Sequence, residues 1–186
     1  FLGKLLIVIP NPRARMLVSN FSHAFPSWGI NRIRSSARQS AARMMEMGFF
    51  SLIYPAMDPH RRRHTLLIDE SSESLLRDLT KKDTPVLFLL PHVCLFESLA
   101  ASPLFRPGEG KSIGAIYRPN RNPNLDKWIQ QARLSSGIKI FSRKEGLKKA
   151  MYFLRNKNWL TILFDQNGGE SGADTYFLNR LTSITT

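Results

Sequence analysis

Four short apolar runs alternate with segments of helical periodicity in the second half of the sequence, and this alternation restricts the fold most. The runs are Val86–Leu90, Ser112–Tyr117, Ile138–Phe141 and Trp159–Phe164. Short apolar runs between Pro, Gly or polar residues are typical of buried strands, and strands that alternate with helices favour a parallel sheet. The sequence therefore predicts an α/β fold with a mixed, mostly parallel sheet flanked by helices.

The first 64 residues have a different character. They contain only two acidic side chains, Glu46 and Asp58, and their periodicity predicts a long helix from Arg32 to about Ile53. We therefore divide the chain into a basic, membrane-proximal helical region, residues 1–64, and an α/β core, residues 65–186. The two form one continuous domain whose core is expected to be incomplete at its C-terminus.

The charge of the chain predicts an anionic partner. Its 27 Lys and Arg residues exceed its 14 Asp and Glu residues, which gives a net charge of +13. Nucleic acid, an acidic membrane surface and a phosphorylated substrate all fit such a charge. The sequence lacks the interleaved aromatic and basic residues of base-stacking surfaces, so we do not expect nucleic acid.

The cysteine and histidine content predicts neither a disulfide nor a metal site. The single cysteine, Cys94, cannot form an intrachain disulfide, and the four histidines show no metal-ligand spacing. No apolar run reaches the ~18 residues of a spanning helix, and Phe1–Ile9 is far too short. Because the sequence opens without Met and stops just after a strand-like stretch, we expect truncation at both ends, with room for a membrane anchor upstream.

Three shorter elements are predicted around the first apolar run. Thr65–Ile68 is interpreted as a short strand, and Ser71 or Ser72 as the cap of a helix over Glu73–Thr80. A further helical pattern runs from Phe96 to Leu104. The basic cluster around Arg61–Arg63 is interpreted as a solvated loop or as a contact with anionic lipid headgroups.

His92 follows the first predicted strand, and Glu97 lies five residues later. On one regular helix the two side chains would point about 140° apart. Because His92 precedes the predicted helix, the connecting loop can fold its imidazole back onto the Glu97 carboxylate. A carboxylate that fixes the tautomer of a histidine prepares it as a general base. A capping histidine beside a solvated glutamate is the alternative.

A charged or titratable side chain follows each of the four predicted strands. These side chains are His92, Arg118, Arg143 and Asp165. Parallel strands have their carboxyl ends at one edge of the sheet, where open α/β sheets bind ligands. The four side chains would then face one cleft. Alternatively, they mark where each strand reaches water.

Six segments carry motifs in a fixed order. They are Asn20–Pro26 (Asn…Ala-Phe-Pro), His92–Glu97 (His-x4-Glu), Tyr117–Pro123 (Tyr-Arg-Pro…Asn-Pro), Arg133, Arg143 and Asp165-Gln166. In this order and spacing they resemble the bacterial lipid A biosynthesis acyltransferases, the lauroyl and myristoyl transferases within the lysophospholipid acyltransferase superfamily. The resemblance covers nearly the whole chain and implies a glycerolipid-acyltransferase-like fold.

The resemblance also implies a reaction. A fatty acyl chain would pass from acyl carrier protein, or coenzyme A, to a hydroxyl of a lipid A precursor, with no bound cofactor and no metal. His92 would be the general base, and Glu97 would orient and charge it. Arg133 would bind the oxyanion or a substrate phosphate, with Arg118 beside it, and Asp165 would hold one of these arginines. The implied substrate-binding set is Arg118, Asn122, Arg133, Arg143, Asp165 and Gln166.

The implied partners are acyl carrier protein, a phosphorylated glycolipid and an anionic membrane surface. The implied location is the cytoplasmic face of the bacterial inner membrane. Two alternatives stay open from the residues themselves. One is an acyltransferase for another glycolipid or lysophospholipid, such as a phosphoinositide mannoside. The other is a non-catalytic basic module that docks on membranes.

Overall fold

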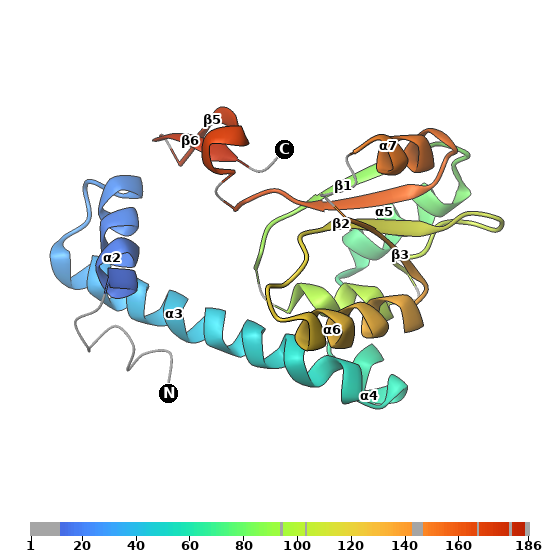
Figure 1. The fold of residues 1–186 in the computed structure, drawn as a ribbon, viewed down its shortest axis with the longest axis horizontal. Coiled ribbons are helices and arrows are strands. Elements are labelled where there is room, and N and C mark those ends of the chain that lie inside the picture. Colours follow the sequence, from blue (N-terminus) through green and yellow to red (C-terminus); the bar gives the residue numbers. More distant parts are fainter. Residues whose placement is uncertain are drawn as a thin grey trace. The chain divides into compact units, whose positions relative to one another are not determined.

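The computed structural model describes residues 12–93, 95–102, 104–142, 147–166, 168–178 and 180–184. The apolar segment Phe1–Ile9, together with Cys94 and Arg143, lies outside the described residues. The chain forms two compact units: Ser51–Asp165 makes one, and the segments before Ser51 and after Asp165 make the other (Figure 1). The predicted division into residues 1–64 and 65–186 stays a prediction.

The unit from Ser51 to Asp165 is built on a four-stranded parallel sheet. Its strands are β1 (Val86–Leu90), β2 (Ile113–Tyr117), β3 (Ile138–Ser142) and β4 (Trp159–Leu163), in the order β1-β4-β2-β3 (Figure 1). The last strand in sequence therefore lies between the first and the second. This sheet confirms the predicted α/β class and the four predicted strands.

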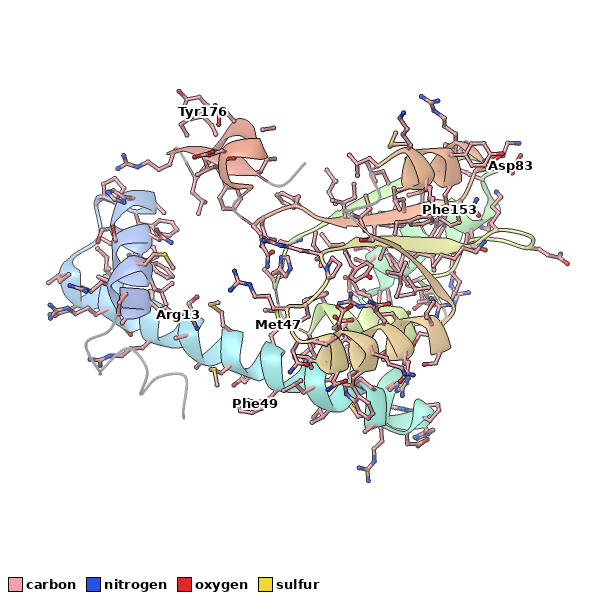
Figure 2. All side chains as sticks on the ribbon, viewed as in Figure 1. Arg13, Met47, Phe49, Asp83, Phe153 and Tyr176 are labelled. Atoms are coloured by element: carbon pink, nitrogen blue, oxygen red, sulfur yellow. The ribbon has the colours of Figure 1, made fainter. Side chains whose placement is uncertain are left out.

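Helices cover both faces of this sheet. Helix α7 (Lys148–Arg155) lies on one face, and α6 (Pro123–Ser135) lies on the other, where η2 (Phe96–Ala101) also contributes (Figure 1). On the α7 face, Ala150 and Phe153 pack against Leu160 of the central strand (Figure 2). A Cβ atom at Gly114 would lie 2.6 and 2.8 Å from the rings of Phe141 and Phe153. The two rings can therefore pack this close to β2 only because residue 114 is a glycine.

Local signals set the ends of α6. The side-chain Oδ1 of Asn122 accepts hydrogen bonds from the backbone N–H groups of Asn124 (3.0 Å) and Leu125 (3.3 Å). Pro123 occupies the first helical position, where a missing N–H costs nothing. After the helix, Gly137 has a φ of +76°, the left-handed conformation that glycine supplies at helix ends.

Three details predicted before and after β1 were wrong: a strand, the cap of a helix and the type of a helix. Thr65–Ile68 forms no strand, because Leu67 is 96% exposed and meets no sheet. Helix α5 (Glu70–Lys81) confirms the helix predicted over Glu73–Thr80, but its cap is Asp69, which accepts from the N–H of Ser72 at 3.0 Å, and not a serine. The helix predicted from Phe96 is the 3-10 helix η2. It ends before Ser102, whose extended backbone is the conformation favoured before a proline.

A short helix replaces the predicted loop around the basic cluster. Helix α4 (Pro59–Arg63) begins at Asp58, whose carboxylate accepts from the N–H of His60 at 3.2 Å. The 3-10 helix η1 (Tyr54–Ala56) precedes it, and the side chain of Arg62 donates to the carbonyls of Met57 and Pro55. One basic side chain of the cluster is therefore used within the fold.

The other unit contains α2 (Pro12–Ala24), most of α3 (Ile30–Ile53), η4 (Gly169–Ser171) and a hairpin of β5 (Ala173–Phe177) and β6 (Arg180–Ile184). Helix α3 confirms the predicted long helix. The Trp28 ring stacks on Phe25 at 4.1 Å, and the Arg32 guanidinium lies 3.9 Å from the centre of the indole. Arg180 donates to the carbonyl of His23 and so ties the hairpin to α2. Within the described residues, no helix is both long and apolar enough to cross a bilayer.

Candidate active site

The sheet opens at its carboxyl edge. Strands β1 and β4 stay paired to their last residues, and so do β2 and β3. Strands β2 and β4 pair only as far as Ala115 and Thr161, two residues before each strand ends. The two halves of the sheet therefore separate at this edge, and such a separation is where open α/β sheets bind ligands.

Three of the four predicted edge residues lie where the sequence placed them. His92 follows β1, Asp165 follows β4, and Arg118 follows β2. Because the strands are parallel, all three stand at the same edge of the sheet. Arg143, the fourth, lies outside the described residues.

His92 is held twice by Asp165. The ring Nδ1 lies 2.6 Å from Oδ1 of Asp165, and the backbone N–H of His92 donates to Oδ2 at 2.8 Å. An ionised carboxylate only accepts hydrogen bonds, so Nδ1 carries the ring proton and Nε2 carries the lone pair. The side chains are 20% and 18% exposed, which keeps the pair in reach of solvent. The Phe96 ring packs edge-on against the imidazole at 5.3 Å.

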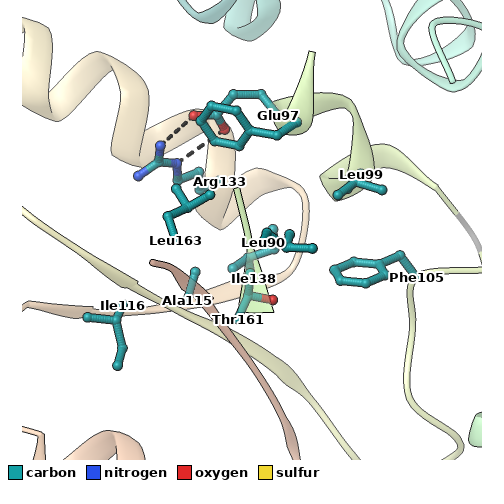
Figure 3. A pocket seen from close by; sticks show the side chains of 11 residues that line it. Leu90, Glu97, Leu99, Phe105, Ala115, Ile116, Arg133, Ile138, Thr161 and Leu163 are labelled. Carbon is teal, nitrogen blue, oxygen red and sulfur yellow. Dashed lines mark hydrogen bonds and ion pairs between the residues drawn. The ribbon is translucent and has the colours of Figure 1, made fainter. Parts of the chain in front are cut away.

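The predicted partners of the two carboxylates are exchanged. Glu97 was expected to orient His92, and Asp165 was expected to hold an arginine. In the structure the Asp165 carboxylate binds the ring of His92. The Glu97 carboxylate instead accepts hydrogen bonds from Nε and Nη2 of Arg133 (Figure 3). Both predicted pairings were therefore wrong, and the catalytic and binding roles of these residues stay predictions.

Local geometry explains the position of Glu97. It lies in the first turn of η2, where it faces α6, and its side chain is 8% exposed. A buried carboxylate requires a cation and good hydrogen bonds. Arg133, in the last turn of α6 and 17% exposed, supplies both in a two-point contact. The pair thus fastens η2 to α6.

A small cavity lies directly beneath this ion pair. It has a volume of about 60 Å³ and lies between the sheet, η2 and α6 (Figure 3). Thr161 of the central strand lines it, and the buried Oγ1 of Thr161 has no hydrogen-bond partner among the described residues. Leu90, Ala115 and Ile138 supply much of its apolar wall. Its volume is too small for an acyl chain.

A larger groove lies beside His92. Its volume is about 390 Å³, within the range of about 300–1,000 Å³ typical of small-molecule pockets. Pro91 and Val93, the two neighbours of His92, both line it, and so does Phe96. Apart from Thr65 and Ser98, its remaining lining is aliphatic: Leu66, Leu90, Leu95 and Leu99. His92 itself does not line the groove, and Phe96 is the lining residue whose ring contacts the imidazole.

The remaining predicted binding residues differ in their surroundings. Arg118 is exposed at the sheet edge, whereas the side-chain oxygen of Asn122 caps α6 by accepting from the N–H of Asn124. Gln166 is exposed and belongs to the other compact unit. Among the residues that the structure describes, no three His, Cys, Asp or Glu side chains gather as a metal site. The binding roles of Arg118, Asn122 and Gln166 stay predictions.

A buried polar layer behind Glu97 was not predicted. Tyr54 is 1% exposed, and this burial raises the pKa of its phenol. Burial also lowers the pKa of Arg106, whose guanidinium donates to the carbonyl of Ser136 at 2.6 Å. Tyr54 precedes α4 and Arg106 follows η2, so no local pattern in the sequence brings them together. The role of Asp165 toward His92 was missed for the same reason.

The fold and its edge define a class: an α/β protein with a parallel sheet that carries a histidine–carboxylate pair at its carboxyl edge. The family model described as "Bacterial lipid A biosynthesis acyltransferase" matches residues 1–186. The chain therefore belongs to this family of acyltransferases, as its six motifs predicted. It is also similar to "Lipid A biosynthesis acyltransferase 2" of Shigella flexneri, with 26% identity over 95 residues. That match covers 51% of this chain and 29% of the relative.

Proposed function

We propose that the protein transfers a fatty acyl chain from acyl carrier protein, or coenzyme A, to a hydroxyl of a lipid A precursor. His92 acts as the general base, and Asp165 orients its ring. One observation carries this proposal: Asp165 binds both the backbone N–H and Nδ1 of His92 at the open edge of the sheet. Membership of the acyltransferase family supplies the reaction class.

The proton inventory of the reaction fits this arrangement. Nε2 of His92 takes the proton of the acceptor hydroxyl, whose oxygen attacks the thioester carbonyl carbon. The C–S bond of the tetrahedral intermediate then breaks, and the imidazolium gives its proton to the departing thiolate. The ester and the free thiol are the products. Asp165 stabilises the imidazolium between these two steps, which is the usual role of a carboxylate on the far side of a catalytic histidine.

The apolar groove is suited to the acyl chain of the donor. Its lining includes Pro91 and Val93 on either side of His92, whereas His92 itself does not line it. In this proposal the thioester carbonyl reaches the imidazole past Phe96. Phe96 connects the groove with the imidazole, because its side chain lines the groove and its ring packs against His92. Burial of apolar groups supplies about 0.8 kcal/mol per methylene, enough to hold a long chain.

Arg118 is suited to a phosphate of the acceptor. Arg118 is exposed directly after β2, the strand next to β4, whereas the guanidinium of Arg133 is already bound to Glu97. Guanidinium groups bind phosphate in a bidentate manner. Arg133 is therefore better suited to holding the site together than to binding substrate. Arg143, Asn122 and Gln166 complete the proposed binding set.

We extend the proposal to partners and location. The net charge of +13 suits an anionic membrane surface and a phosphorylated glycolipid as partners. Acyl carrier protein is the proposed protein partner, and nucleic acid is not among the proposed partners. A lipid A precursor would be met at the cytoplasmic face of the bacterial inner membrane. An acceptor of another lipid class would use the same chemistry and the same groove.

The test is acyl transfer by His92→Ala in the full-length protein. Loss of a general base should lower kcat by roughly 10²–10⁴-fold, and binding to vesicles with anionic lipid should be unchanged. His60→Ala is the matched control, since His60 is an exposed histidine outside the site, on α4. Equal activity of the two variants would refute the role of His92. Mass spectrometry of lipid A from cells that carry His92→Ala should show one acyl chain missing.

A further inference from the structure

The loop between β2 and α6 presents two arginines to solvent. Arg118 and Arg121 are both exposed, and neither has a hydrogen bond or ion pair within the described parts of the chain. The loop is five residues long, from Arg118 to Asn122, and it starts at the carboxyl edge of the sheet. Two prolines, Pro119 and Pro123, restrict its backbone. Two exposed guanidinium groups without a partner among the described residues are suited to binding an anionic ligand.

The backbone of this loop is bound to the helix that follows. The N–H of Asn120 donates to Oδ1 of Asp126 at 2.7 Å. The N–H of Asn122 donates to the side-chain oxygen of Asn120 at 3.0 Å. Each bond fixes a residue that adjoins Arg121, so the loop cannot swing freely about its ends.

A side-chain network extends this restraint to the other end of the loop. The amide nitrogen of Gln130 donates to Oδ2 of Asp126 and also to the hydroxyl of Tyr117, the latter at 2.8 Å. One amide nitrogen carries two hydrogens, so it can serve both acceptors. Tyr117 is the last residue of β2, and Asn120 lies within the loop. Asp126 and Gln130 thus connect the strand on one side of Arg118 with the backbone on its other side.

We propose that Asp126, together with Gln130, is a positioning residue for phosphate recognition by Arg118 and Arg121. The proposal rests on the proposed function, in which Arg118 binds a phosphate of the acceptor. Neither Asp126 nor Gln130 touches the substrate. They hold the loop in one conformation before the acceptor arrives, so that the guanidinium groups meet the phosphate already aligned.

The physical effect is on affinity. A fork-shaped guanidinium gains two parallel hydrogen bonds only in the right orientation. If the loop were free, its ordering would oppose binding by the cost of immobilising each side chain. Because Asp126 and Gln130 act on the loop and not on the reacting groups, loss of their hydrogen bonds should raise the KM for the acceptor and leave kcat nearly constant.

The experiment compares Gln130→Ala with Gln131→Ala in the full-length enzyme. Gln131 is the exposed neighbour on the same helix, so the two variants remove the same group from different surroundings. Gln130→Ala and Asp126→Ala should raise the KM for the phosphorylated acceptor by about 3- to 10-fold, with the KM for the acyl donor unchanged. Asp126→Asn should keep most of the affinity, because its oxygen still accepts from Asn120 and the Gln130 amide can turn over to match.

A second acceptor separates positioning from general damage to the fold. With a lipid A precursor whose phosphates have been removed, Gln130→Ala and Gln131→Ala should show the same KM. If Gln130→Ala matches Gln131→Ala on the phosphorylated acceptor while Arg118→Ala raises its KM, the positioning role is wrong and the proposed function stands. If Arg118→Ala also leaves KM unchanged, the phosphate role of Arg118 in the proposed function is wrong.

Discussion

Two acid–base pairs in this protein have similar chemistry and different settings. His92–Asp165 lies at the open edge of the sheet, with both side chains about one-fifth exposed. Arg133–Glu97 lies above the internal cavity, and its carboxylate is 8% exposed. The first pair combines a carboxylate with an imidazole, and the second combines a carboxylate with a guanidinium, which is a permanent cation.

The difference between the pairs teaches where chemistry can occur. Proton transfer needs a nitrogen that gains and loses its charge and that substrate can reach. In the proposed function the His92 ring serves both needs, with Asp165 bound to its Nδ1. Arg133 meets neither, and its guanidinium is turned toward Glu97 (Figure 3). We therefore expect activity to depend on the first pair and stability on the second.

The largest effect is expected from Asp165→Asn. His92 presents two donors, its N–H and Nδ1–H, and an amide has only one acceptor oxygen. The amide nitrogen would donate to one ring nitrogen and favour the wrong tautomer. The kcat of acyl transfer should fall by roughly 10²–10⁴-fold with little change in stability. Glu97→Gln tests the comparison: if it loses as much kcat at unchanged stability while Asp165→Asn stays active, Glu97 is the partner of His92 after all.

The next effect is on folding. Glu97→Ala leaves the Arg133 guanidinium buried without its carboxylate, and breaking a buried pair in this way costs about 3–5 kcal/mol of unfolding free energy. Urea unfolding measures it. The double variant Glu97→Ala/Arg133→Ala should recover part of the loss, because no unpaired charge remains. Independent, additive losses would show that the two side chains do not interact.

A smaller effect of opposite sign is expected from Thr161→Val. The Thr161 hydroxyl lies below the Arg133–Glu97 pair and has no partner within the described residues. Valine has nearly the same shape, so removing the unpaired hydroxyl should raise the unfolding free energy by up to about 1 kcal/mol. Thr65→Val is the control and should destabilise, since the Thr65 hydroxyl donates to the carbonyl of Arg62 at 2.7 Å. A loss at Thr161 would mean that its hydroxyl is bonded.

The smallest effect concerns the exposed carboxylate of Asp83, which forms ion pairs with both Lys111 and Lys157. The hydrogen bonds of Lys111 and then Lys157 lower the pKa of Asp83 from 3.8 to about 2. A lowered pKa means that this carboxylate stabilises the fold above pH 3.8 and that the stabilisation is lost as the pH falls from 3.8 toward 2. Asp83→Asn should therefore be slightly less stable than the parent at pH 7, with the difference gone near pH 2. A constant difference across this range would contradict the assignment. Asp83 is marked in Figure 2.

Much of the fold was readable from the sequence because its signals are local. The apolar runs predicted the bounds of β1 to β4 to within one residue. Helical periodicity predicted α3, which starts at Ile30 instead of Arg32. Predictions were wrong where a segment depended on distant partners. Thr65–Ile68 is apolar enough for a strand but has no neighbour to pair with, and the helix after His92 is shortened to η2 in front of a proline.

By itself, the sequence determined the elements and placed a charged or titratable residue behind each strand, because apolar runs must end where the chain reaches water. Only the tertiary structure decided which of these residues meet. Strand β4 inserts beside β1 and brings Asp165 to His92 across 73 positions of sequence. Glu97, five positions away, is turned by η2 toward α6 and Arg133. Strand order is set by packing over the whole sheet, so no spacing in the sequence could reveal this exchange of partners.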